Sequence, residues 1–234
     1  MRKLLFLSLL LQVSIVSAQF NAEKKKDFLV TISTSFGDMQ VILYDITPKH
    51  KQNFIKLAKE GFFDGTTFHR IIEGFMIQGG DPNSKDDNPH NDGQGGPGYT
   101  VPAEFNPSLF HKKGVLSAAR KGDFANPQKA SSGSQFYIVQ GKKYTDLELN
   151  NISQRSEVKY TDHQKEIYKT IGGTPFLDGS YTVFGEVIKG FDVIDKIARQ
   201  AKARNDRPIK NIEMKVSVSE SKKKDITKMT GFNF

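Results

Sequence analysis

Short hydrophobic segments with a period of two residues dominate this chain, and that period is typical of half-buried β-strands. Val30 and Ile32 alternate with polar residues, a turn-forming break follows at 35–38, and a second alternation runs over 39–44. Together they predict an antiparallel hairpin at the start of the fold. Further short apolar runs, each bounded by Gly, Pro, Asn or Asp, lie at 67–72, 75–78, 114–118, 135–139, 182–187 and 212–218.

Two segments have the period of an amphipathic helix. Thr47 offers an N-cap with Pro48 at the first helical position, and apolar residues recur at helical spacing up to Gly61. Near the carboxyl end, Ile194 and Ile197 lie on one apolar face of a second helix. Many short strands bracketed by two helices predict a mainly β fold, with a closed or nearly closed antiparallel barrel rather than a doubly wound sheet.

Residues 144–173 fit neither pattern, because they are charged and helix-like. The segment contains two capping boxes, in which a threonine caps a helix and the side chain three residues later reaches back. One box pairs Thr145 with Glu148, and the other pairs Thr161 with Gln164. We therefore expect a helical hairpin inserted into the barrel.

The amino end has the features of a secretory signal peptide over residues 1–18. Arg2 and Lys3 precede an apolar run over 4–16, and a small-residue site ends at Ala18. The alternative is an uncleaved anchor, but the run is shorter than the roughly 20 apolar residues that span a bilayer. We expect an exported protein without stable membrane insertion after cleavage, in a bacterial periplasm or, alternatively, secreted or in the endoplasmic reticulum lumen.

Composition narrows the class of protein. The chain has no cysteine, so it forms no disulfide and no lipid-modified cysteine. Its formal net charge is +8, and residues 219–234 form a basic carboxyl-terminal tail. Acidic residues are interspersed and no nucleic-acid motif is present, so a solvated basic surface is favoured over nucleic-acid binding.

The most informative segment is FHRIIEGFMIQGGD at 68–81, two short strands joined by a turn at Glu73-Gly74. Here the chain resembles the cyclophilin family of peptidyl-prolyl cis-trans isomerases. The resemblance continues in order through LSAA at 116–119, GSQFYI at 133–138, FLDG at 176–179 and VFG at 183–185. It covers about 28–218 and implies an eight-stranded antiparallel β-barrel capped by two α-helices, with the hairpin inserted.

The resemblance also implies a shallow proline-binding groove on the outside of the barrel. Arg70 and Gln78 are the expected catalytic residues, with Gln78 orienting Arg70 and the substrate. The remaining residues that the resemblance assigns to substrate binding are Phe75, Met76, Tyr137 and Leu177 in the proline pocket, Phe176 in its apolar wall, Ile72 and Tyr181 at its flanks, and Ala119, Arg120 and Gln135 in the neighbouring groove.

Arg70 suits the physical problem that such an enzyme solves. Amide resonance sets a rotation barrier of roughly 18–20 kcal/mol, and twisting the bond frees the lone pair of the prolyl nitrogen. A guanidinium donor aimed at that nitrogen stabilises the twisted state more than either planar one. This chemistry needs no proton transfer, metal or cofactor, so the rate should be nearly independent of pH between about 6 and 9.

The expected substrates are proline-containing unfolded or flexible polypeptides, where isomerisation limits folding. The alternative function is a proline-peptide binding module or holdase in which catalysis is incidental. Arg70 and Gln78 favour the enzyme, because a pure binder does not need a cationic donor.

Three positions depart from the better-known pattern of the family. Phe176 stands where many members have Trp, so we expect weak or no cyclosporin binding, because the indole N–H donor is missing. Tyr181 stands where many have His, which argues against an essential imidazole. Arg120 replaces a common Asn, and this substitution is expected to alter the preference for residues beside the proline.

One loop is rich in possible metal ligands. The segment NSKDDNPHND at 83–92 contains Asp86, Asp87, His90 and Asp92. The ligand types are mixed and lack a recognised spacing, so a solvated, turn-rich loop is favoured over a metal site. His69 is likewise expected to be a structural residue rather than a catalytic one.

Overall fold

A computed structural model describes residues 25–86 and 88–234. The predicted signal peptide and Asp87 therefore lie outside the described residues. The chain divides into a large unit, residues 30–218, and a small unit that combines residues up to 29 with residues 219–234.

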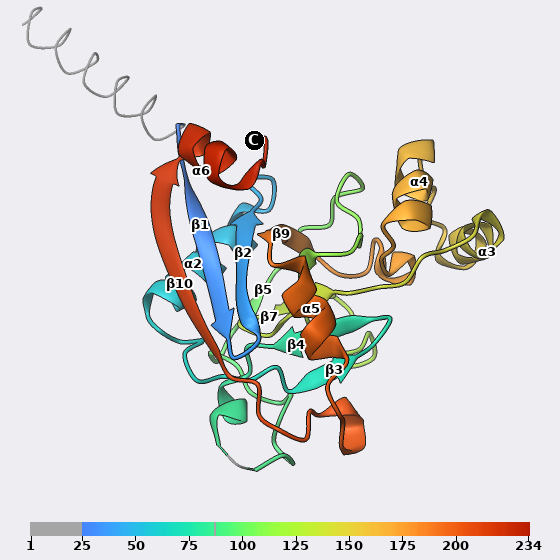
Figure 1. The fold of residues 1–234 in the computed structure, drawn as a ribbon. Coiled ribbons are helices and arrows are strands. Elements are labelled where there is room, and N and C mark those ends of the chain that lie inside the picture. The colour runs from blue at the N-terminus through green and yellow to red at the C-terminus, as the bar shows by residue number, and fades with distance from the viewer. Residues whose placement is uncertain (1–24, 87) are drawn as a thin grey trace, which may run out of the picture. The chain divides into compact units, whose positions relative to one another are not determined.

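Eight strands form one antiparallel sheet in the order β10-β1-β2-β9-β6-β8-β4-β3. They correspond to the eight alternating or apolar segments of the sequence, which Figure 1 shows from β1 in blue to β10 in red. A separate two-stranded ribbon of β5 (Thr100–Val101) and β7 (Ser131–Ser132) was not predicted. The strands of the main sheet are β1 (Lys26–Thr34), β2 (Gly37–Leu43), β3 (Arg70–Ile72), β4 (Met76–Gly79), β6 (Val115–Ala118), β8 (Phe136–Val139), β9 (Val183–Lys189) and β10 (Met214–Lys222).

Closure of this sheet into a barrel, which the sequence predicted, is not detected as pairing between the edge strands β3 and β10 in the described residues. The chain segments just before the two edge strands do meet. Thr67 and Glu213 form an isolated antiparallel bridge, and the Met214 amide donates to the Thr66 carbonyl at 2.8 Å. The contact consists of a few backbone hydrogen bonds, and β3 itself is only three residues long.

Helix α2 (Pro48–Lys59) packs its apolar face into the core of the large unit. The ring of Phe54 lies 4.7 Å from that of Phe63 and 5.5 Å from that of Phe136, measured between centroids. Helix α5 (Phe191–Ala198) buries Ile194 and Ile197, as the sequence predicted. The contact between Phe54 and Phe136 anchors α2 to β8, the strand that carries Phe136.

The start of α2 is stabilised differently from the prediction. Thr47 occupies the N-cap position but makes no side-chain capping hydrogen bond. Glu104 caps the helix instead, because its carboxylate accepts from the backbone amides of Lys49 at 3.1 Å and His50 at 3.0 Å. A carboxylate at a helix N-terminus is also favoured by the helix dipole.

The predicted helical hairpin is present as α3 (Asp146–Ser156) and α4 (Asp162–Thr170). Both capping boxes are formed, with Thr145 and Glu148 satisfying one helix start and Thr161 and Gln164 the other. Figure 1 shows the two helices beyond one side of the sheet.

The fold is mixed α/β rather than mainly β, since the described residues form five α-helices and not only the two capping helices and the hairpin. The additional helix is α6 (Lys223–Thr230), within the segment expected to be a basic tail. In the described part of the chain, none of the helices combines the length and the apolar character needed to cross a bilayer.

Candidate active site

Strand register brings the two expected catalytic residues together. In the β3–β4 hairpin Arg70 is paired with Gln78, and Ile72 with Met76. Because side chains of a strand alternate between faces, these four residues lie on one face of the hairpin. Gly74 adopts a φ of 77° in the connecting turn, a conformation that favours glycine.

A chain of side-chain hydrogen bonds orients the guanidinium group. Arg70 Nη1 donates to Gln78 Oε1 at 3.4 Å, and Gln78 Nε2 donates to Gln135 Oε1 at 3.3 Å. Gln135 Nε2 in turn donates to the Gly95 carbonyl at 2.8 Å. Each amide is oriented by the next, so the Gln78 carbonyl oxygen points toward Arg70.

Beside Arg70 lies a small pocket of about 180 Å³. Met76 and Tyr137 form a buried part of its wall, and Leu177 comes from the short 3-10 helix at Pro175–Leu177. Burial raises the pKa of Tyr137 well above its usual value, so its hydroxyl stays protonated. The residues that line the pocket are Arg70, Phe75, Met76, Gln78, Ala119, Arg120, Tyr137, Leu177 and Tyr181.

All nine lining residues belong to the set expected from the sequence, and the other three expected residues lie around this pocket. Phe176 is half exposed, with its ring 5.5 Å from that of Phe75 between centroids. Ile72 packs against the apolar cluster that contains Met76. Gln135 lines the neighbouring groove rather than the pocket. The structure thus brings the expected residues together, while their roles remain predictions.

Arg120 is held in the wall between the pocket and the groove. Its guanidinium carbon lies 4.5 Å from the centroid of the Tyr181 ring, a distance suited to a cation–π contact. Its Nε donates to the Ser180 carbonyl at 2.8 Å, and its Nη1 pairs with Asp123 at 2.5 Å. Only 5% of the Arg120 side chain is exposed, so its charge is fixed in place.

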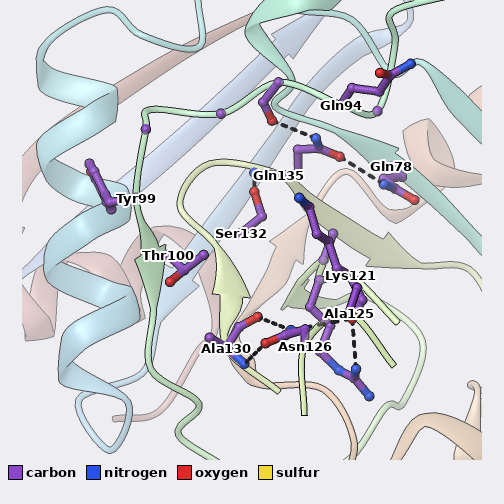
Figure 2. A pocket seen from close by; sticks show the side chains of 16 residues that line it. Gln78, Gln94, Tyr99, Thr100, Lys121, Ala125, Asn126, Ala130, Ser132 and Gln135 are labelled. Carbon is purple, nitrogen blue, oxygen red and sulfur yellow. Dashed lines mark hydrogen bonds between the residues drawn. The ribbon is translucent and has the colours of Figure 1, made fainter. Parts of the chain in front are cut away.

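The neighbouring groove has a volume of about 800 Å³ and shares Gln78, Ala119 and Arg120 with the pocket. Figure 2 shows Gln135 at the junction, bonded to Gln78, with Lys121 and Asn126 farther along. Sequence reasoning missed much of this lining, because it comes from two connecting segments and the short β5–β7 ribbon, none of which has a periodic pattern. The residues missed are Gly93, Gln94, Gly95, Gly96, Gly98, Tyr99, Thr100, Lys121, Ala125, Asn126, Ala130 and Ser132.

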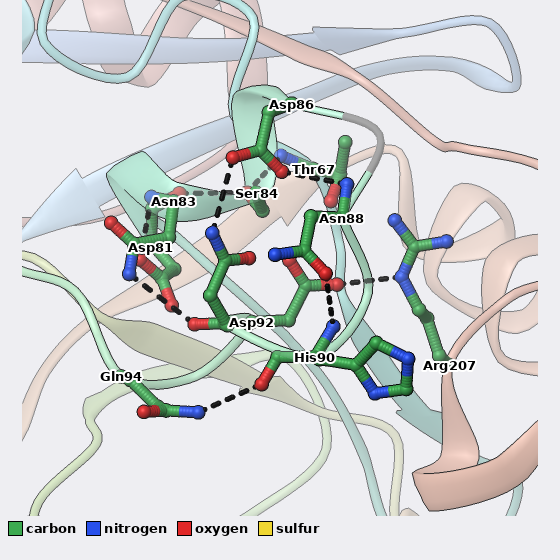
Figure 3. Close-up of polar contacts among 11 residues, drawn as sticks. Thr67, Asp81, Asn83, Ser84, Asp86, Asn88, His90, Asp92, Gln94 and Arg207 are labelled. Carbon is green, nitrogen blue, oxygen red and sulfur yellow. Dashed lines mark hydrogen bonds and ion pairs between the residues drawn. The ribbon is translucent and has the colours of Figure 1, made fainter.

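In the acidic loop after β4, carboxylates accept hydrogen bonds from other groups of the protein. Asp86 accepts from the Asn88 amide at 2.8 Å, and Asp92 accepts from Arg207 Nε at 2.6 Å, as Figure 3 shows. The described residues contain no cluster of three or more His, Cys, Asp or Glu side chains placed to hold a metal ion. His69 is buried and does not line the pocket, and burial lowers its pKa despite the nearby carboxylates of Asp81 and Asp92.

Comparison with known proteins identifies relatives of this chain. Residues 29–218 match the family described as cyclophilin type peptidyl-prolyl cis-trans isomerase/CLD. A Staphylococcus epidermidis protein named "Putative peptidyl-prolyl cis-trans isomerase" is 37% identical over 199 residues, which cover 83% of this chain and 93% of that protein. A protein of the same name from Staphylococcus aureus has the same identity and coverage.

Solved structures give the same assignment. A crystal structure of a Cryptosporidium parvum cyclophilin type peptidyl-prolyl cis-trans isomerase superposes with a TM-score of 0.62 at 28% identity, covering 83% of this chain and 98% of that one. A crystal structure of that protein in the presence of the dipeptide Ala-Pro gives a TM-score of 0.61 at 27% identity, covering 82% and 98%. The chain therefore belongs to the cyclophilin-type peptidyl-prolyl cis-trans isomerase family and is itself a peptidyl-prolyl cis-trans isomerase.

Proposed function

We propose that the enzyme accelerates rotation about X-Pro bonds in exported proteins through donation from Arg70 to the prolyl nitrogen. The observation that carries this proposal is the position of Arg70 at the edge of the apolar pocket, oriented by Gln78. A proline ring seated against Met76, Tyr137 and Leu177 brings its nitrogen to the rim where the guanidinium lies. The pocket holds the ring while the preceding carbonyl rotates.

This arrangement stabilises the twisted amide selectively. In a planar amide the nitrogen lone pair is conjugated and is a poor acceptor, whereas in the twisted state it is free. A hydrogen bond to a charged group contributes about 1.5–3 kcal/mol, and each 1.36 kcal/mol is a factor of ten in rate. Arg70 alone therefore accounts for a factor of about 10–150, and seating of the ring supplies the remainder.

The substrates we propose are proline-containing unfolded or flexible segments of proteins that leave the cytoplasm. The pocket is open to a groove of about 800 Å³, which can take the residues beside the proline in an extended chain. The case for export rests on residues 1–18, whose sequence has the pattern of a cleaved signal. Amino-terminal sequencing of the mature protein should find Gln19 first, and a start at Met1 would contradict export by this signal.

The direct test of the mechanism is isomerisation of a short Xaa-Pro peptide by the wild type, by Arg70→Ala and by Arg155→Ala. Arg155 is an exposed arginine on α3 and serves as the matched control. We expect kcat/KM to fall about 10- to 150-fold only in Arg70→Ala. A folded wild type that gives no acceleration would instead favour the binding-module function, and an unchanged Arg70→Ala would refute the role of Arg70.

A further inference from the structure

The inserted hairpin lies in the chain between two parts of the proline pocket. Tyr137 of β8 precedes the insertion, and Leu177 follows it. A cluster of aromatic side chains anchors the hairpin, and Tyr168 of α4 is fully buried at its centre. The hairpin is thus built onto the chain segments that form the pocket wall.

A buried chain of polar contacts runs from the hairpin to the pocket. The Tyr168 hydroxyl donates to Asp178 Oδ2 at 2.5 Å. The other carboxylate oxygen, Oδ1, accepts from the backbone amide of His111 at 2.8 Å and contacts its Nδ1 at 2.7 Å. His111 Nε2 then lies 3.0 Å from the hydroxyl of Tyr137. All four side chains are buried, with no more than 6% exposed.

The carboxylate of Asp178 orients the His111 ring. A carboxylate can only accept, so Asp178 holds the proton of His111 on Nδ1. The hydrogen bond between His111 Nε2 and the Tyr137 hydroxyl then fixes the position of that hydroxyl, whichever of the two atoms donates. The His111 and Tyr137 rings also stack nearly parallel, 12° apart at 6.1 Å between centroids.

We propose that Tyr168, Asp178 and His111 are positioning residues that hold the Tyr137 ring in the wall of the proline pocket, so that the inserted hairpin controls catalysis. This inference rests on the proposed function, because it assigns a role to residues behind the same pocket. Of the three residues against which the proline ring is proposed to sit, Tyr137 carries the hydroxyl that ends this series of contacts, whereas Met76 and Leu177 contribute apolar atoms only.

The test is a double-mutant cycle between the two residues at the ends of this hydrogen-bonded series, Tyr168→Phe and Tyr137→Phe. The variants are assayed with a short Xaa-Pro peptide. Each change removes one hydroxyl and keeps the ring. We expect Tyr168→Phe to lower kcat/KM by about 3- to 10-fold in the wild-type background. In the Tyr137→Phe background we expect an effect of less than twofold, because the hydrogen bond between Tyr137 and His111 is already absent.

Tyr160→Phe is the matched control. Tyr160 belongs to the same aromatic cluster, but its hydroxyl donates to the Pro175 carbonyl at 2.8 Å and takes no part in the chain to Tyr137. Its effect on kcat/KM should be the same in both backgrounds. If Tyr168→Phe also has equal effects in both, its role is only to stabilise the hairpin and the inference is overturned.

Two further results keep the test decisive. If thermal unfolding shows that Tyr168→Phe is not folded at the assay temperature, Tyr137→Phe alone must lower kcat/KM by about 3- to 10-fold, and an unchanged rate would overturn the inference. Failure of the proposed mechanism is separate, because it appears as an Arg70→Ala variant that is as active as the wild type, whatever the outcome of the cycle.

Discussion

Replacement of Phe176 by Trp should raise the affinity for cyclosporin, which we expect to be weak or absent in the natural chain. The side chain is 48% exposed and its ring meets that of Phe75 at 5.5 Å and 42°, so a larger ring can extend over the pocket edge without entering the core. The indole adds an N–H donor at the place where phenylalanine offers only carbon.

The size of the gain follows from two contributions. One added neutral hydrogen bond is worth about 0.5–1.5 kcal/mol net. An indole covers on the order of 30 Å² more apolar surface than a phenyl ring, which adds about 0.8 kcal/mol. Together they give about 1.3–2.3 kcal/mol, or a roughly 10- to 50-fold lower Kd.

Isothermal titration of cyclosporin into the wild type, Phe176→Trp and Phe234→Trp measures this gain. Phe234 is 47% exposed at the carboxyl terminus and matches Phe176 in exposure. We expect tighter binding only in Phe176→Trp. An unchanged Kd in that variant, or an equal gain in Phe234→Trp, would show that the missing indole does not limit the affinity.

Three further predictions concern the groove and the frame of the site. Gln135→Leu removes a link behind Arg70 and should lower kcat/KM for a short peptide by about 2- to 10-fold, the value of one hydrogen bond; no change would mean that the amide chain does not orient Arg70. Lys121 is exposed in the lining of the groove, whereas the charge of Arg120 is paired with Asp123. Peptides with Glu beside the proline should therefore be isomerised several-fold faster than peptides with Lys, and 0.5 M salt should reduce the difference; equal rates at low salt would exclude this preference. Burial raises the pKa of Glu104, but hydrogen bonds from His50 and Lys49 outweigh it and hold the pKa below the usual value. Glu104→Gln should therefore lower the free energy of unfolding by about 1–3 kcal/mol at pH 7, and the difference should shrink as pH falls through the lowered pKa, below about 4.5; a difference that grows at acid pH in urea titrations would contradict this assignment.

Local patterns were sufficient to predict the strands of the main sheet and the inserted hairpin, and they place Arg70 beside Gln78. Arg70 and Gln78 are eight residues apart across a short turn, so a period of two places them on one face. The two capping boxes are equally local, because each joins residues three apart. Such features are encoded within one element and its turn.

Contacts between distant segments could not be predicted in this way. Glu104, and not Thr47, caps α2, although it lies 54 residues after His50 in the sequence. No periodic pattern in the sequence indicates this contact. His111 and Asp178 are 67 residues apart, and each has an ordinary local environment in the sequence. Helix α6 was missed for a different reason, since Ile226 is its one buried residue and the basic side chains around it resemble a solvated tail.

The measurement that tests the account most directly is kcat/KM for a short Xaa-Pro peptide, taken from pH 6 to 9 with the wild type and Arg70→Ala. Because arginine stays charged over this range and no proton is transferred, we predict a flat profile for the wild type and a loss of about 10- to 150-fold in the variant at every pH. A wild-type rate that follows a single ionisation, or an Arg70→Ala variant within twofold of the wild type, would contradict the electrostatic mechanism.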